Sequence, residues 1–139
     1  MPIEIGESSW PVVYIQAIGA GTDEDIDAYI EVLQRSLDRK ERHAVIVDAS
    51  RGKTMASRHR RRLAEWNRKN ANMLTAYRAG LILVTTSPFV RGIIRTVYWL
   101  ARPPFPYLIS ESLDSAKADA LRLLLGEESD LNATPVDNE

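Results

Sequence analysis

The fold is decided by a short apolar run in the first half of the chain, Ala44-Val45-Ile46-Val47, which ends at Asp48. An unbroken run of this length is typical of a central strand that is buried on both faces of a parallel sheet. A second run of the same kind, Leu81-Ile82-Leu83-Val84-Thr85, follows Gly80. Two buried strands joined by a long intervening segment predict parallel neighbours with a right-handed crossover between them.

The segments on either side of these two runs have apolar residues at helical spacing, which predicts helices between the strands. Thr22 and Asp25 form a capping-box pattern, and Ser87-Pro88 is typical of a helix start. We expect strands at residues 3–7, 11–18, 44–47, 81–85 and 105–109. We expect helices from Thr22 to the basic residues near position 42, at 56–77, from Ser87 to before Pro103, and at 113–125. Residues 49–54 are expected to form a loop.

The resulting order, β-β-α-β-α-β-α-β-α, predicts an α/β fold with a mostly parallel sheet, an antiparallel edge strand and four helices. A length of 139 residues suits one domain, which we assign to residues 1–125. Residues 126–139 are acidic after Gly126, and we expect a disordered tail.

Several classes of function lack their required residues. The chain has no cysteine, and His43 and His59 lack ligand spacing, so we expect no metal. Neither a phosphate-binding glycine loop nor a nucleophile elbow is present, so we predict a non-enzyme without a cofactor. The start of the chain has no signal-peptide pattern, and the uncharged stretch 79–90 is too short to span a membrane. We therefore expect a cytoplasmic protein.

Charge is distributed unevenly along the chain, although the net charge is only -1. Residues 1–50 carry a net -6, residues 51–102 a net +11, and residues 103–139 a net -6. A basic middle indicates an anionic partner. The alternative is that the two signs neutralise each other across the folded surface.

The element order resembles the STAS domain of anti-sigma-factor antagonists and sulfate-transporter tails. Val45-Ile46-Val47-Asp48-Ala49-Ser50 matches the strand end of that family. An ungapped reading places Ala56-Ser57-Arg58-His59 on the family's Asp-Ser-Ser-Gly turn, with Ala56 in place of the Asp and His59 in place of the Gly. The resemblance implies a STAS-like fold, a regulatory role and phosphorylation of Ser57.

The chain also resembles a looser group of bacterial STAS-like proteins, which are related in fold to small CRAL-TRIO lipid-binding domains. The matching segments are Trp10-Pro11-Val12-Val13 and Trp99-Leu100-Ala101-Arg102-Pro103-Pro104. This second resemblance implies no established activity.

Cations gather where the second helix is expected to begin, and they oppose the positive end of the helix dipole. A local rule broken in this way indicates anion binding. The candidate residues in this segment are Arg51, Lys53, Arg58, Arg61 and Arg62, with Arg60 and His59 among them and Arg68 and Lys69 further along the helix. The alternative is a solvated face paired with the acidic first helix or with a neighbouring subunit. Ser57 and Thr54 are candidate helix caps.

The third helix has a wide apolar arc, which we expect to pack in the core. Arg91, Arg95 and Arg102 are expected on the opposite side with Trp99 beside them, where they suit a protein partner or an anionic lipid surface. Asp48 follows a central strand but lacks the acidic pair and the lysine of a phosphoacceptor site. We expect it to accept hydrogen bonds from the loop that follows.

The leading hypothesis is a regulatory module that binds an anionic protein through a basic surface on the second and third helices. Lipid binding through the third helix is the alternative. Nucleic acid ranks below both because no reading motif is present. A homodimer is also considered, with Trp66, Tyr77, Tyr98 and Trp99 as its candidate contacts.

Overall fold

Five strands form one sheet in the computed structural model, which describes residues 3–6, 10–19, 21–52, 56–100 and 102–126, and five helices flank it there. The strands are β1 (Ile3–Gly6), β2 (Val12–Gly19), β3 (His43–Gly52), β4 (Arg78–Val84) and β5 (Tyr107–Ser110). The helices are α1 (Asp23–Asp38), α2 (Ser57–Lys69), α3 (Ala71–Tyr77), α4 (Pro88–Leu100) and α5 (Leu113–Leu124).

The strand order across the sheet is β1-β2-β3-β4-β5. The strands from β2 to β5 are parallel to one another, whereas β1 pairs antiparallel with β2 at the edge. The predicted α/β class with a mostly parallel sheet is therefore confirmed.

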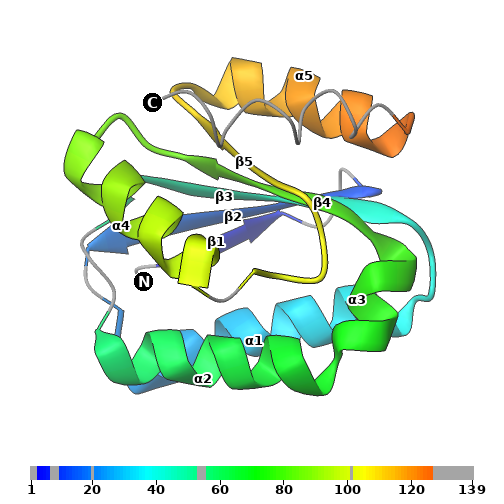
Figure 1. Ribbon diagram of the computed structural model, residues 1–139, viewed down its shortest axis with the longest axis horizontal. Helices are drawn as coiled ribbons and strands as arrows, with labels where there is room; N and C mark the ends of the chain where they lie inside the picture. The colour runs from blue at the N-terminus through cyan, green and yellow to red at the C-terminus, as the bar shows by residue number, and fades with distance from the viewer. Residues whose placement is uncertain (1–2, 7–9, 20, 53–55, 101, 127–139) are drawn as a thin grey trace.

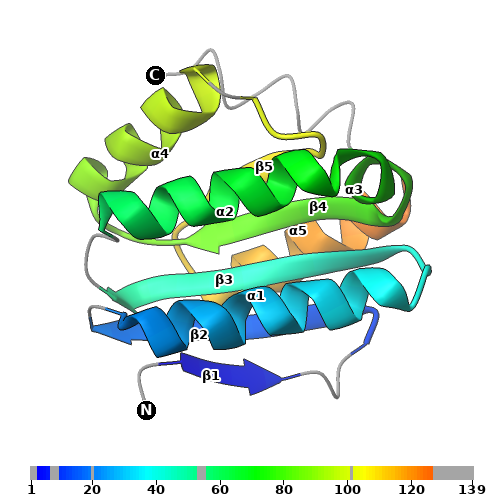
Figure 2. The same cartoon turned by 90° about the horizontal axis from the view of Figure 1, so that it is seen from below.

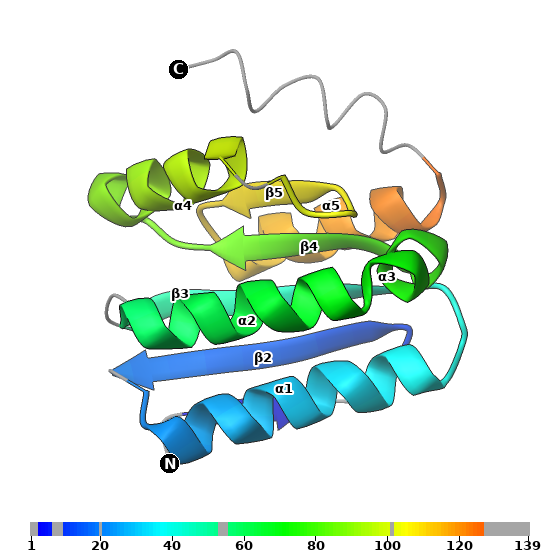
Figure 3. The ribbon, with the colours of Figure 1, turned by 60° about the horizontal axis from the view of Figure 1, so that its bottom comes forward.

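The helices lie in two layers. Figure 1 shows α1, α2 and α3 on one face of the sheet and α5 on the other. Seen from below, α1 runs along β2 and β3, α2 runs along β3 and β4, and α4 lies out beyond the β5 side (Figure 2). Figure 3 shows the same separation of α4 from the body of the layer. This placement leaves α4 with one side turned away from the sheet.

The two faces of β3 explain its unbroken apolar sequence. Val45 and Val47 pack into the cluster under α1, α2 and α3, and Ala44 and Ile46 pack into the cluster under α5. Because side chains alternate along a strand, both registers must be apolar when both faces are covered.

The prediction of four helices is wrong. The segment expected to be one helix at 56–77 is divided at Asn70, whose φ of -109° and ψ of 20° are not helical. The Asn70 side chain donates to the carbonyl of Trp66 at 2.9 Å, and the Asn70 backbone N–H donates to the same carbonyl at 3.1 Å. The chain therefore turns there and starts α3.

The expected loop at 49–54 is also wrong in its first part. β3 continues to Gly52, because Ile18 and Gly19 of β2 pair with Arg51 and Gly52. Residues 53–55 and the predicted tail from residue 127 onward lie outside the described residues. Within the described part of the chain, no helix is long and apolar enough to cross a bilayer.

Candidate functional site

The second helix starts at the carboxyl end of the parallel sheet without a side-chain cap. Its N-cap residue is Ala56, and no side chain accepts a hydrogen bond from the first turn. The prediction that Ser57 caps the helix is wrong, because Ser57 is already inside it and its Oγ accepts from Arg60 Nη2 at 3.0 Å. Thr54, the other candidate cap, is outside the described residues. The first turn of α2 therefore begins with cations and no acid.

The side of α2 nearest α1 is neutralised within the chain. Arg58 Nε lies 3.2 Å from Asp23 Oδ1, and His59 Nε2 lies 2.7 Å from the same oxygen. Arg62 forms an ion pair with Asp27. The hydrogen bond from His59, followed by that from Arg58, lowers the pKa of Asp23. For these cations, the alternative of internal pairing with the acidic first helix is confirmed.

The outer side of α2 is different. Arg61, Arg68 and Lys69 are exposed, and among the residues that the structure describes they have neither a carboxylate partner nor a hydrogen bond. We call these three residues the α2 cationic face. The side chains of Arg51 and Lys53 are not described, so their prediction stays untested. The basic segment is therefore divided into a paired inner side and an open outer face.

The arginines of α4 do not form the solvated stripe that the sequence predicted. Arg91 Nη2 lies 3.3 Å from Glu111 Oε2, and both Arg91 and Arg95 are partly buried. Their Nε atoms are fully buried. The exposed residue Arg102 lies beyond the helix. Because α4 is displaced toward the β5 edge, the helix turns its arginines partly inward.

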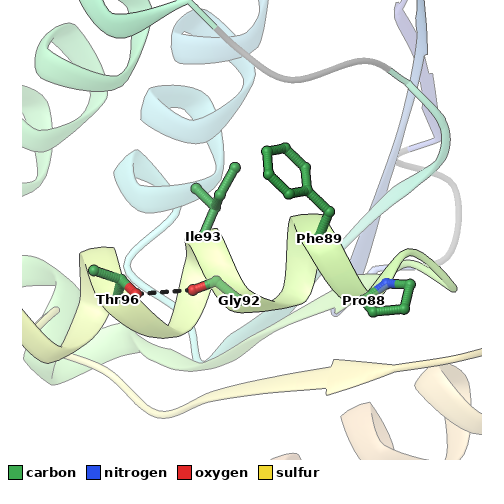
Figure 4. A pocket seen from close by; sticks show the side chains of 5 residues that line it. All are labelled: Pro88, Phe89, Gly92, Ile93 and Thr96. Carbon is green, nitrogen blue, oxygen red and sulfur yellow. Dashed lines mark hydrogen bonds between the residues drawn. The ribbon is translucent and has the colours of Figure 1, made fainter.

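Two large aromatic residues of α4 are exposed, while Val90, Ile93 and Ile94 are partly buried. Phe89 is 69% exposed and Trp99 is 72% exposed, so the prediction that Phe89 packs in the core is wrong. Phe89 and Ile93 project to the same side of the helix, and the Thr96 hydroxyl donates to the Gly92 carbonyl at 3.0 Å (Figure 4). Pro88, Phe89, Gly92, Ile93 and Thr96 line an open hollow of about 530 Å³.

Asp48 has the structural role that the sequence predicted. Its Oδ1 accepts from the backbone N–H of Ser50 at 3.0 Å and from the Ser50 hydroxyl at 2.6 Å. The Tyr14 hydroxyl donates to Oδ2 at 3.2 Å. The bond from Tyr14 links β2 to β3, and the bonds from Ser50 lie within β3.

A polar cluster at the opposite end of the sheet was not predicted. His43 is fully buried and stacks on Trp10, with 5.3 Å between ring centroids. Arg39 lies 3.7 Å above the Trp10 ring, and the Trp10 indole donates to Glu41 at 2.9 Å. The sequence could have indicated this cluster, because Trp10 and His43 each stand just before an apolar run. When two such runs form neighbouring parallel strands, the residues before them lie at the same end of the sheet.

Comparison with known proteins gives similarity in structure only. No protein-family model matches the chain, and no curated protein matches it. An uncharacterized protein with a SpoIIAA-like fold from Shewanella loihica has a TM-score of 0.61 and 17% identity, over 88% of this chain and 91% of that one. The unphosphorylated anti-sigma factor antagonist SpoIIAA has a TM-score of 0.60 and 12% identity, over 86% and 97% of the two chains.

A third similar structure is an anti-sigma factor antagonist from Mycobacterium paratuberculosis, with a TM-score of 0.54 and 13% identity over 86% of this chain and 92% of that one. All three similarities extend over most of both chains at low identity, so they establish the fold and not a shared activity. The chain has the SpoIIAA-like fold of STAS domains, as the resemblance in its sequence implied.

Proposed function

We propose that this chain is a non-catalytic regulatory module that binds an anionic protein through the α2 cationic face. The observation that carries the proposal is the difference between the two sides of α2. The inner cations Arg58 and Arg62 have carboxylate partners on α1, whereas the outer face has none among the described residues. Cations that do not serve the fold and face solvent are available to a negatively charged partner.

Exposed aromatic residues elsewhere on the described surface favour a protein as the partner. The exposed aromatic side chains Phe89 and Trp99 lie on α4, and aromatic residues with arginine are enriched where proteins bind each other. Two of the similar structures are anti-sigma factor antagonists, a name that favours regulation through protein contacts. Arg51 and Lys53 belong to the same proposal as supporting cations, whereas Arg91, which pairs with Glu111, and Arg95, which is turned inward, do not.

The test is affinity capture with the purified chain in three forms. The first is the wild type, and the second carries Arg61→Glu, Arg68→Glu and Lys69→Glu. The third carries Lys40→Glu, Lys117→Glu and Arg122→Glu, which make the same charge change at exposed positions away from α2. Quantitative mass spectrometry should show a partner retained by the first and third forms and depleted about tenfold or more by the second. The same captured set on all three forms would rule out the α2 cationic face.

Phosphorylation of Ser57 is part of the proposal as its regulatory step. Ser57 is exposed in the first turn of α2, and its hydroxyl already contacts Arg60. A phosphate there would add about -1.5 to -2 charges beside the cationic face and reduce its attraction for an anion. We expect Ser57→Asp to weaken capture of the same partner and Ser57→Ala to leave it unchanged; equal capture by both variants would count against this step.

Binding to an anionic lipid surface is the second candidate function. The exposure of Phe89 and Trp99 on one helix favours it, because aromatic side chains enter the membrane interface. Co-sedimentation with vesicles of increasing phosphatidylserine content distinguishes the two. Lipid binding through α4 predicts sedimentation that rises with the anionic fraction and falls in Trp99→Ser, whereas attraction of vesicles to the α2 cationic face predicts that Trp99→Ser changes nothing.

A further inference from the structure

The outward side of α4 has a regular pattern that its packing within the chain does not explain. Phe89, Gly92, Thr96 and Trp99 are all exposed, and their spacings of three, four and three residues place them on one face of the helix. We call these four residues the α4 outer stripe. It has large aromatic side chains at both ends, small side chains in the middle and no charge.

We propose that the α4 outer stripe packs antiparallel against the same stripe of a second copy of this chain. The spacing reads the same in both directions along the helix. A two-fold axis at the middle of the stripe therefore places Phe89 opposite Trp99 of the second copy and Gly92 opposite Thr96 of the second copy. Such self-complementarity is what an interface between identical chains requires.

The hollow beside α4 provides a place for the incoming aromatic side chain. Its lining includes Pro88, Phe89 and Gly92, at the end of the stripe where the antiparallel arrangement brings Trp99 of the second copy (Figure 4). The two-fold axis creates two such contacts. A methyl group built at Gly92 meets nothing within 4 Å, so the middle of the stripe is open to another helix.

The charges on α4 and the surface area buried in the interface indicate how strong the proposed dimer is. A two-fold axis brings like charges together, but neither cation of α4 points freely into the stripe: Arg91 pairs with Glu111, and Arg95 has a buried Nε and an interaction within the chain. The four aromatic side chains of a dimer would remove about 600 Å² of exposed surface, from about 150–250 Å² for each whole side chain. With the glycine and threonine of each stripe added, the interface stays below the about 1,000–1,200 Å² that specific complexes bury. The dimer should therefore dissociate on dilution.

This inference is independent of the α2 cationic face, which stays outside the stripe. It replaces the earlier candidate contact Trp66, which is 8% exposed and donates to Gln34 within the chain. Trp99 is the candidate that remains at the centre of the proposal.

Sedimentation velocity of the full chain from about 10 to about 500 µM tests the proposal, because a small interface indicates weak association and the dimer then needs a high protein concentration to form. The wild type should shift from monomer toward dimer across this range. Phe89→Ser with Trp99→Ser should remain monomeric, with unchanged circular dichroism because both positions are exposed. Leu121→Ser, which changes an exposed leucine on α5, should associate like the wild type. A wild type that stays monomeric throughout, or a double variant that associates equally well, would overturn the proposal.

Disulfide crosslinking tests the antiparallel register without removing the aromatic residues, and the native chain contributes no cysteine. Facing helices about 8–10 Å apart bring the Cα atoms of opposed positions to about 5 Å, within disulfide range. The same position in the two copies, such as Gly92 and Gly92, is offset by four residues, or about 6 Å along the helix axis. The Cα atoms of such a pair therefore lie beyond disulfide range. Gly92→Cys mixed with Thr96→Cys should crosslink several-fold faster than either variant alone. Equal rates in all three samples would contradict this register.

Discussion

His43 shows how one residue at a strand end depends on its surroundings. Its Nδ1 donates to the carbonyl of Glu41 at 2.9 Å, which leaves Nε2 unprotonated in the neutral ring. Nε2 is buried with no hydrogen-bond partner among the described residues. Burial lowers the pKa of His43, and Arg78 and Arg39 lower it further, against an opposing effect of the Glu41 carbonyl. The folded chain therefore favours the neutral ring.

The first prediction concerns the pH dependence that this lowered pKa produces. Below the ordinary histidine pKa of 6.5, the unfolded chain binds a proton that the folded chain resists. This contribution to stability is complete above 6.5 and is lost as the pH falls toward the lowered value. We expect the urea midpoint of the wild type to fall between about pH 6.5 and 5, before most carboxylates titrate.

The matched variant is His43→Phe, which keeps a ring against Trp10 but does not titrate. Its urea midpoint should fall less over the same pH range, since its other titrating groups are those of the wild type. Parallel midpoint curves for the two proteins would show that His43 does not contribute.

At the residue scale, the sequence predicted local hydrogen bonds better than it predicted exposure. The capping box of Thr22 and Asp25 is confirmed, with bonds of 2.9 and 3.2 Å, and Ser87 Oγ accepts from the N–H of Val90 at 3.2 Å. These interactions depend on neighbours in the chain. The burial of His43 depends on Trp10 from the turn before β2, which is distant in the sequence, so no local pattern could indicate it.

At the element scale, α5 is docked on β4 through a close contact at Gly80. A Cβ added at Gly80 would lie 2.5 Å from Leu123 Cδ1 and 3.3 Å from the carbonyl oxygen of Pro106. Leu123 is fully buried in the cluster under α5. The absence of a side chain at Gly80 therefore lets the helix approach the sheet.

The second prediction is a double-mutant cycle at this contact. Gly80→Ala should lower the free energy of unfolding by about 1–3 kcal/mol through overpacking. Leu123→Ala should lower it by about 2–5 kcal/mol through the cavity it leaves. The double variant should lose less than the sum, by about 0.5 kcal/mol or more, because the shortened Leu123 no longer meets the added methyl group. Urea denaturation measures all three.

Gly92→Ala provides the control for this cycle. It makes the same substitution in α4, where the added methyl group meets no atom within 4 Å. We expect it to stabilise the chain by about 0.5–1 kcal/mol, the usual effect of replacing a glycine inside a helix. A loss comparable to that of Gly80→Ala would show that the close approach of α5 is not the cause.

The third prediction concerns the contact between α1 and α2. Arg62 and Asp27 form an ion pair in which both side chains are about half exposed. Such pairs contribute about 0–1 kcal/mol, so Arg62→Gln and Asp27→Asn should each change the free energy of unfolding by no more than that. Thermal unfolding checks both. A much larger loss would mean that the pairing of α2 with α1 is a main contributor to the stability of the fold.

Element boundaries also show what the sequence could not predict. The apolar periodicity runs continuously from α2 into α3, so it predicted one helix where the non-helical backbone of Asn70 divides two. The amphipathic pattern of α4 was recognised, but its apolar arc was assigned to the core. Whether a face is covered depends on where the helix lies relative to the sheet, and periodicity does not contain that information.

At the scale of the whole molecule, some residues of the basic middle segment form ion pairs with the acidic segments on either side of it. The acidic first helix neutralises the inner side of α2, and Glu111 pairs with Arg91 of α4. The sequence predicted both an open basic surface and internal pairing as alternatives, and the structure contains each of them on different sides of one helix. The sequence could not show which cations of α2 are paired and which are open, because it does not indicate which way each side chain points.

The last prediction uses the acidic segment from residue 127 to the end, which carries five acidic residues and no basic one. Its removal changes the net charge of the chain from -1 to +4. We predict that residues 1–126 keep the circular dichroism of the full chain and elute from a heparin column at higher salt, since an anionic matrix attracts the remaining cations. Adding Arg61→Glu, Arg68→Glu and Lys69→Glu to the shortened chain should remove most of this gain. The charge-matched set Lys40→Glu, Lys117→Glu and Arg122→Glu should remove less, because heparin senses the local arrangement of cations as well as the total. Equal losses for the two sets would mean that net charge alone governs retention and that the α2 cationic face has no special affinity for anions.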